Sequence, residues 1–327
     1  MNLDFFNKIM KNINKFFNSV LRLSLLHKVF IIFLVLLFAS YFNINYNYEY
    51  IESFDNNEKF IQKYDDDIYD KQYAHYYDSI FLNKKRNNFE YENIKPYIKD
   101  NNAKILDIGS GTGYTTNLFN KNNIDSVGLD KSSDMINAAK IKYPTSKYEI
   151  GDILDIKGFD FNEFSHITCL GKTIYEIKDK KLFFENCKPL LEEDGYLILH
   201  LVDRNNFKPY VQEVNKNVLY NPEKYNKNID QLLVKFDKNN EYISNFKKKE
   251  NESTNKLGND VKPYITYYEK FENFSNNNVR KNEINLYIPE ISKILELAKV
   301  KGFKLVDKIE MNSVGYLNEF LYIFKKQ

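Results

Sequence analysis

Short apolar runs alternate with helix-like stretches between Ala103 and Val202. Five of these runs are closed by glycine, aspartate or a polar turn, which is typical of buried strands in a parallel sheet. The predicted strands are residues 103–108, 125–130, 147–152, 165–170 and 195–202. Helical stretches fill the gaps at residues 114–121, 133–141 and 179–191. This alternation predicts an α/β fold with a doubly wound parallel sheet.

The pattern changes between residues 205 and 283, where the chain becomes polar and rich in asparagine and lysine. Polar and apolar positions alternate there with the period of two that half-buried strands have. We therefore predict an antiparallel β insertion after the fifth strand. Its strand-like runs are residues 232–236, 241–247 and 264–274.

The end of the chain returns to the earlier pattern. Residues 289–300 have the periodicity of an amphipathic helix, which Gly302 ends. Two further strands are predicted at residues 303–311 and 317–326.

An apolar segment at residues 29–45 begins with fourteen uncharged residues, Val29 to Phe42. Basic residues precede this segment and acidic residues follow it, so the positive-inside rule puts the N-terminus in the cytosol. A cleaved signal peptide is the alternative, and the side of the membrane on which the rest of the chain lies stays open. We predict a single-pass membrane location with these parts: a basic leader (1–28), a hydrophobic anchor (29–45), an acidic linker (46–68) and a catalytic domain (69–327).

Composition narrows the choice of partners. The 47 basic and 45 acidic residues leave a formal charge of +2, which offers no overall footprint for a nucleic acid. The chain has two cysteines, Cys169 and Cys187, without the spacing of a zinc site or a disulfide framework. We expect no metal.

The most informative segment reads Ile-Leu-Asp-Ile-Gly-Ser-Gly-Thr-Gly-Tyr from Ile105 to Tyr114. A strand here opens through a glycine-rich turn into a helix, which turns backbone amides and a helix N-terminus toward a ligand. The segment resembles motif I, D-x-G-x-G-x-G, of the class I S-adenosylmethionine-dependent methyltransferases. The resemblance implies a Rossmann-like, seven-stranded sheet with an antiparallel last strand. It also implies that Asp107 reaches the ammonium group of the cosubstrate.

Nicotinamide-binding proteins have the fingerprint G-x-G-x-x-G, whereas the spacing here is Gly109-x-Gly111-x-Gly113, and of the two segments that follow, the second separates the families. Asp130 ends the second strand, seventeen residues after Gly113, where a carboxylate accepts hydrogen bonds from ribose in either family. Gly151-Asp152-Ile153 resembles the strand-three motif of the methyltransferases. In that motif an aspartate meets the adenine amino group and the next apolar residue covers the ring. The resemblance extends over residues 69–326.

The resemblance implies S-adenosyl-L-methionine as cosubstrate. The expected binding residues are Asp107, Gly109, Ser110, Gly111, Thr112, Gly113, Asp130, Lys131, Met135, Gly151, Asp152, Ile153, Cys169 and Tyr77.

The acceptor is expected at the carboxyl ends of the fourth and fifth strands. Residues 168–175 depart from the Asn/Asp-Pro-Pro-Tyr motif of DNA and glutamine amino-methyltransferases. They are similar to the loop of small-molecule methyltransferases of the glycine N-methyltransferase and sugar-amine type. The segment 69–81 resembles the helix that covers the cosubstrate in those enzymes, with Tyr76 and Tyr77 at matching positions.

His200, near the end of the fifth strand, is our candidate general base, and Tyr76 is a second catalytic candidate. The alternatives are a hydrogen-bonded structural histidine and a tyrosine that packs the helix onto the domain. Cys169 ends an apolar strand without a neighbouring histidine, which favours packing over a nucleophilic role. Methyl transfer to a neutral amine needs only positioning and desolvation.

The expected activity is transfer of a methyl group from S-adenosylmethionine to a small-molecule acceptor, an amine or a hydroxyl. One alternative is methylation of an RNA or a protein at a membrane. Another is a catalytically idle scaffold that has kept the fold. The intact glycines and both acidic residues favour an enzyme.

Overall fold

The computed structural model describes residues 24–30, 33–34, 60–98, 102–156, 158–207, 231–236, 238–248, 265–273 and 275–327. Contacts divide the chain into two units, Met1–Ser53 and Phe54–Gln327. In the first unit, residues 25–30 and 33–34 are helical. All other described residues belong to the second unit.

The predicted single-pass membrane location is wrong. The predicted association with a membrane is therefore not supported either. Among the residues that the structure describes, no helix combines the length and the apolar character needed to cross a bilayer. A helix of fourteen uncharged residues rises only about 21 Å, against about 30 Å of hydrocarbon. Most of the predicted anchor, 29–45, lies outside the described residues.

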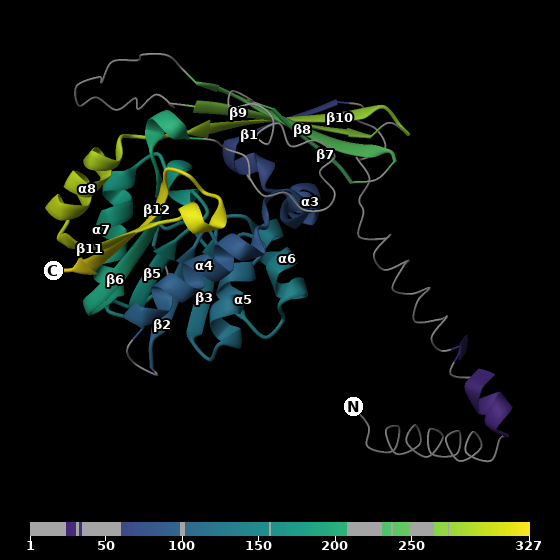
Figure 1. Cartoon of the computed structure of the whole chain (residues 1–327), viewed down its shortest axis with the longest axis horizontal. Helices are drawn as coiled ribbons and strands as arrows, with labels where there is room; N and C mark the ends of the chain where they lie inside the picture. Colours follow the sequence, from purple (N-terminus) through teal and green to yellow (C-terminus); the bar gives the residue numbers. More distant parts are fainter. Residues whose placement is uncertain are drawn as a thin grey trace. The chain divides into compact units, whose positions relative to one another are not determined.

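A seven-stranded sheet forms the centre of the second unit (Figure 1), in the order β11-β12-β6-β5-β2-β3-β4. Neighbouring strands from β6 to β4 run parallel, whereas β12, the last strand of the chain, is antiparallel to both of its neighbours. This topology confirms the predicted Rossmann-like fold. The strands are β2 (Lys104–Ile108), β3 (Asp125–Asp130), β4 (Lys147–Ile150), β5 (Phe164–Cys169), β6 (Leu191–Val202), β11 (Phe303–Glu310) and β12 (Glu319–Lys326).

Helices cover both faces of this sheet because its central strands are apolar on both sides. On one face, α4 (Lys84–Ile94) and α5 (Tyr114–Lys121) pack in a core with Ile105 and Ile198. On the other face, α7 (Lys180–Leu190) and α8 (Ile291–Val300) pack with Leu106 and Leu197. The remaining helix beside the sheet is α6 (Ser133–Lys142).

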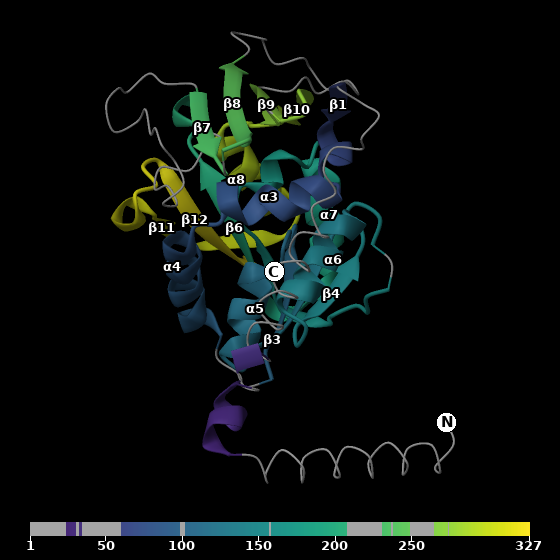
Figure 2. The ribbon, with the colours of Figure 1, turned by 90° about the vertical axis from the view of Figure 1, so that its right-hand side faces the viewer.

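A second sheet has five strands in the order β1-β10-β9-β8-β7. Strands β7 to β10 pair antiparallel, which confirms the predicted insertion. Figures 1 and 2 show α3 (Lys71–Phe81) between the two sheets. The strands are β1 (Phe60–Tyr64), β7 (Gln231–Lys235), β8 (Asn240–Lys248), β9 (Ile265–Asn273) and β10 (Asn278–Leu286).

The structure differs from the expected linker at residues 46–68. Its last nine residues form β1 and the 3-10 turn η1 (Asp65–Ile68). Strand β1 pairs parallel with β10, with Phe60 opposite Val279. The residues before α3 are therefore part of the second sheet.

Candidate functional site

The glycine-rich turn joins β2 to α5 at the carboxyl edge of the large sheet. Gly109, Gly111 and Gly113 have φ values of +67°, +54° and +84°, which favour glycine. Space is also restricted, because a Cβ on Gly109 would collide with the side chain of Thr173 and one on Gly113 with the ring of Tyr148. The turn is therefore fixed by backbone conformation and by packing together.

Asp130 at the end of β3 is held by two backbone amides. The amide of Gly111 donates to its Oδ2 and that of Ser132 to its Oδ1, each at 2.9 Å. Burial raises the pKa of this carboxyl, and the two amide hydrogen bonds act against the rise. The carboxylate thus has a fixed orientation beside the turn.

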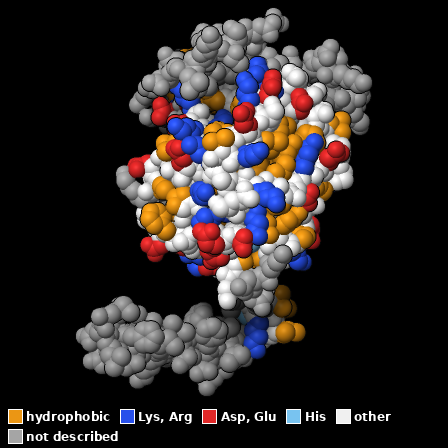
Figure 3. Space-filling model, turned by 90° about the vertical axis from the view of Figure 1, so that its left-hand side faces the viewer, with side chains coloured by type: hydrophobic (Ala, Val, Ile, Leu, Met, Phe, Trp, Pro, Cys, Tyr) orange, Lys and Arg blue, Asp and Glu red, His pale blue; other side chains and the backbone are white. Residues whose placement is uncertain are grey.

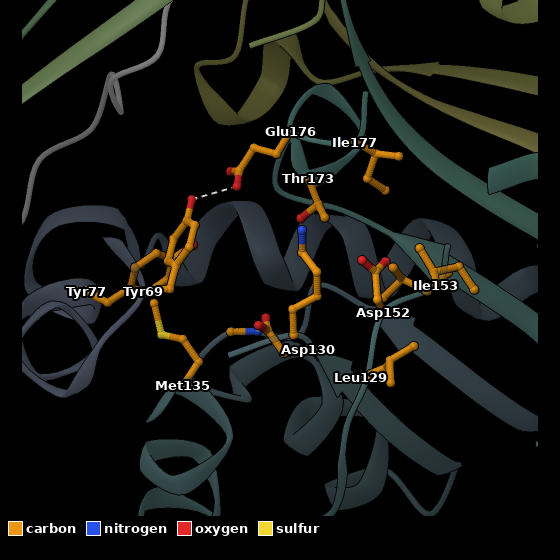
Figure 4. A pocket seen from close by; sticks show the side chains of 15 residues that line it. Tyr69, Tyr77, Leu129, Asp130, Met135, Asp152, Ile153, Thr173, Glu176 and Ile177 are labelled. Carbon is orange, nitrogen blue, oxygen red and sulfur yellow. Dashed lines mark hydrogen bonds between the residues drawn. The ribbon is translucent and has the colours of Figure 1, made fainter. Parts of the chain in front are cut away.

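A first cavity, with about 640 Å³ of space including its opening to solvent, lies above Asp130 (Figure 4). Figure 4 shows Leu129, Asp130 and Met135 below it and Thr173 and Glu176 above it. Nine of the predicted cosubstrate residues line this cavity: Tyr77, Gly109, Gly111, Asp130, Lys131, Met135, Gly151, Asp152 and Ile153.

A second cavity of about 700 Å³ shares Tyr77, Gly109 and Thr173 with the first, so the two meet at these residues. Its wall includes charged groups that the first cavity lacks, among them Asp107 and Arg86. The predicted residues that line it are Tyr77, Asp107, Gly109, Ser110 and Thr112.

Asp107 carries a carboxyl that is nearly sealed from solvent. It accepts hydrogen bonds from Thr116 Oγ1 at 2.8 Å and from Thr168 Oγ1 at 2.9 Å. Burial raises the pKa of Asp107 to about 6, although both hydrogen bonds favour the charged form. A ligand ammonium group beside it would favour the carboxylate further.

Four of the predicted site residues line neither cavity. Gly113 precedes α5 at the end of the turn. Cys169 is fully buried, and burial raises the pKa of its thiol, so it packs as an inert side chain. Tyr76 stacks on Phe236, with ring centroids 4.4 Å apart.

His200 is the fourth predicted site residue that lines neither cavity. It is fully buried in β6, and its Nε2 lies 2.9 Å from Glu319 Oε2. The structure therefore places our candidate general base among protein groups rather than beside a cavity. Tyr76 and His200 remain untested as catalytic residues.

The sequence analysis missed Glu176, which lies one residue beyond the segment 168–175 that we expected at the acceptor site. Tyr69 Oη donates to Glu176 Oε2 at 2.7 Å, and both residues line the first cavity (Figure 4). Surrounding protein atoms desolvate this carboxyl and raise its pKa to about 7, against the effect of the Tyr69 hydrogen bond.

The backbone explains why Glu176 faces the cavity. The 3-10 turn η3 (Thr173–Tyr175) is followed by Glu176, whose amide donates to Thr173 O at 3.0 Å. Residues i and i+3 of a 3-10 turn lie on the same side. Thr173, where the two cavities meet, and Glu176 are therefore neighbours on one wall.

Sequence comparison relates the chain to known proteins. Residues 99–267 match the protein family described as "Methyltransferase domain". The chain spans about half the length of the curated relatives it matches. It is 28% identical over 114 residues to the ubiquinone biosynthesis O-methyltransferase of Coxiella burnetii, which covers 34% of this chain and 47% of that relative.

Solved structures with the same fold cover more of the chain. An S-adenosylmethionine-dependent methyltransferase of Clostridium acetobutylicum matches with a TM-score of 0.55 and 18% identity, over 78% of this chain and 98% of that one. The CcbJ methyltransferase of Streptomyces caelestis matches with a TM-score of 0.57 and 12% identity, over 79% of this chain and 97% of that one. The sugar N-methyltransferase KedS8 of Streptoalloteichus matches with a TM-score of 0.53 and 14% identity, over 78% of this chain and 92% of that one.

Proposed function

Because the chain belongs to the methyltransferase domain family, we propose that it transfers the methyl group of S-adenosyl-L-methionine to a small molecule with an amine or a hydroxyl group. The observation that carries the proposal is the pair of adjoining cavities at the glycine turn. A donor with an adenosine half and an amino-acid half needs two such compartments, and of the described residues that line the two, only those of the second include an arginine for a ligand carboxylate.

The residues of each cavity suit one half of the donor. In the first, Asp130 accepts hydrogen bonds from the ribose, and Asp152 and Ile153 bind the adenine by its amino group and its face. In the second, Asp107 meets the ammonium group and Arg86 the carboxylate, which a guanidinium binds through paired N–H donors. The sulfonium then lies between the cavities, beside the ring of Tyr77, whose face attracts a cation.

A hydroxyl or a protonated amine must lose a proton, and Glu176, beside Thr173 where the two cavities meet, offers a carboxylate to accept it. When bound, the donor supplies a methyl carbon bonded to a positively charged sulfur. Glu176 takes the proton that the acceptor loses as its nitrogen or oxygen bonds to that carbon, and Tyr69 orients the carboxylate. The electrons of the broken carbon–sulfur bond stay on sulfur, which leaves a neutral thioether. We therefore assign the role of general base to Glu176 in place of His200, our first candidate.

Two observations support a small acceptor over an RNA. Relatives of the chain include a ubiquinone O-methyltransferase and a sugar N-methyltransferase by name. In addition, basic and acidic side chains are interspersed over the face seen in Figure 3, whereas a backbone-binding surface gathers positive charge.

Calorimetric titration of the purified chain with S-adenosylmethionine and S-adenosylhomocysteine tests the donor site. We expect micromolar binding, and we expect Gly111→Arg to abolish it, because Gly111 has a φ of +54° and lines the first cavity, so an arginine would strain the turn and fill the space that the donor needs. A folded protein that binds neither ligand would favour the idle scaffold instead.

A labelled methyl donor then tests the acceptor. Amines, phenols and hydroxylated metabolites form one arm of the screen, and capped RNA forms the other. Transfer to RNA alone would contradict the small-molecule proposal.

A further inference from the structure

Five charged side chains form a line behind the second cavity, which we call the charge chain. Lys172 Nζ lies 2.9 Å from Glu319 Oε1, and Glu319 Oε2 lies 2.9 Å from His200 Nε2. On the other side of the imidazole, His200 Nδ1 lies 3.4 Å from Glu90 Oε1. That same oxygen lies 3.6 Å from Arg86 Nε. Positive and negative groups therefore alternate from Lys172 to Arg86.

The middle of the charge chain is sealed from solvent, since the side chains of Glu90 and His200 are 0% exposed. Burial alone would lower the pKa of His200, but the hydrogen bond to Glu319 and the nearby carboxylates of Glu319 and Glu90 outweigh it and raise the pKa. Burial would raise the pKa of Glu319, but Lys172 and His200 lower it to about 2. With the imidazole of His200 protonated, three cations and two anions leave one surplus positive charge.

Arg86 is the end of the charge chain that faces the second cavity. It lines the second cavity, and its Nη2 lies 3.7 Å from the position of a Cβ on Gly171. Within the described part of the chain, Arg86 Nε has no hydrogen-bond partner. Its contact with Glu90 is thus an ion pair without a hydrogen bond, and the balance of charge around Glu90 governs how the guanidinium is placed.

We propose that His200 is a positioning residue: its positive charge pairs with the carboxylate of Glu90, so that Arg86 stays directed at the carboxylate of the methyl donor. This inference rests on the proposed function. Without that charge, Arg86 is the remaining cation at Glu90, and Coulomb attraction draws the guanidinium toward it and away from the cavity. The surplus positive charge, which complements the ligand carboxylate, is lost as well.

A matched pair of ligands tests this role: S-adenosylhomocysteine and its decarboxylated analogue, which differ only in the carboxylate. The measured quantity is the ratio of their dissociation constants for the full chain. Arg86→Gln should reduce the preference for the carboxylate about 10- to 100-fold, as expected for a lost charged hydrogen bond. His200→Gln should reduce it about 3- to 30-fold, as expected for a residue that acts through a neighbour. Both variants should keep the affinity for the decarboxylated ligand.

The control is His166→Gln. His166 is a buried histidine of β5 whose pKa burial lowers to about 4, so it is uncharged and lies outside the charge chain. This variant should keep the full preference. The inference would be overturned if His200→Gln kept the wild-type preference for the carboxylate, or if it weakened the binding of both ligands equally. A wild type that binds neither ligand would count against the proposed function instead.

A pH titration of the wild type gives an independent measurement if His200→Gln does not fold. The groups that face His200 are Glu90 from α4, Glu319 from β12 and the ring of Tyr316, whose pKa burial raises to about 12. The pKa of His200 is raised, so the carboxylate preference should persist at the ordinary imidazole value of about 6.5 and fall at higher pH, as the imidazole loses its proton. The amino groups of the two ligands titrate differently, because only one has a carboxylate beside it, so the same titration of Arg86→Gln serves as the reference. A preference that stays constant as the pH rises, or the same fall in Arg86→Gln, would contradict the role of His200.

Discussion

At the scale of single residues, Glu176 gives the proposed reaction a definite pH dependence. Its pKa of about 7 comes from desolvation by the surrounding protein. A protonated carboxyl cannot accept a proton, so kcat/KM should rise as the pH increases through about 7. Glu176→Gln should remove this rise and lower kcat about 10²- to 10⁴-fold. The measurement is the pH profile of methyl transfer to the best acceptor from the screen.

The matched control is Glu185→Gln, which removes an exposed carboxylate that pairs with Lys301 on the outer surface. It should keep the wild-type profile. If Glu176→Gln also kept the rise near pH 7, the proton would go to another group.

Asp130 allows a second test at this scale. Asp130→Ala should weaken the binding of S-adenosylhomocysteine by about 1–3 kcal/mol, because the ribose hydroxyls lose a charged acceptor. Asp125→Ala at the start of the same strand is the control, since Asp125 is exposed and pairs with Lys147. Titration calorimetry measures both, and equal affinities in the two variants would remove Asp130 from the donor site.

Single residues also mark where prediction from sequence ended. The glycines, Asp107 and Asp130 belong to short contiguous motifs, so their place at the cavities could be predicted. The partners of His200 lie far away in the chain, with Glu319 separated from it by 119 residues. No local pattern reveals that such a histidine is enclosed by two carboxylates, and a strand-end histidine therefore resembled a general base.

At the scale of elements, the same distinction separates predicted from missed structure. The predicted strands and helices of the large sheet have strong periodicity, and the structure confirms them, whereas α4 (Lys84–Ile94) was not predicted. Strand β1 has five residues and a partner more than two hundred positions away, Phe60 opposite Val279. Its formation depends on that partner rather than on its own sequence, so we assigned its residues to a linker.

The contact between α3 and the second sheet is the element-scale feature with the clearest consequence. Arg280 of β10 is 1% exposed and donates to Asp70 Oδ1 at 2.7 Å and to Ile68 O at 2.7 Å. Asp70 in turn caps the N-terminus of α3 by accepting from the amide of Tyr73 at 3.0 Å. The insertion thus holds in place the helix that carries Tyr77.

Arg280→Met should therefore destabilise the fold by about 3 kcal/mol, because it leaves a capping carboxylate without its buried partner. Urea unfolding measures the change. Lys281→Met is the matched control, because the neighbouring Lys281 is exposed. A similar small loss in both variants would show that the ion pair contributes little.

At the scale of the whole second unit, the proposed donor site is assembled from distant parts of the chain. The glycine turn and strand ends form its floor, the turn after β5 forms a wall, and α3 adds Tyr77. Because the second sheet holds α3, the insertion stabilises the donor site as well as extending the fold. Changes in the insertion should therefore affect donor affinity even where they touch neither cavity.

The pairing of β1 with β10 also determines where the chain can be shortened. A fragment that begins at Tyr69, the start of the domain predicted from sequence, would lack β1 and leave β10 with open N–H and C=O groups along one edge. Because β1 is an edge strand of five residues, its loss exchanges a short open edge for the nine-residue edge of β10, and long open edges pair with other copies. We expect such a fragment to self-associate in sedimentation velocity experiments, and a fragment that includes Phe60 to sediment as a smaller species. Recombinant versions for crystallisation should therefore begin before Phe60.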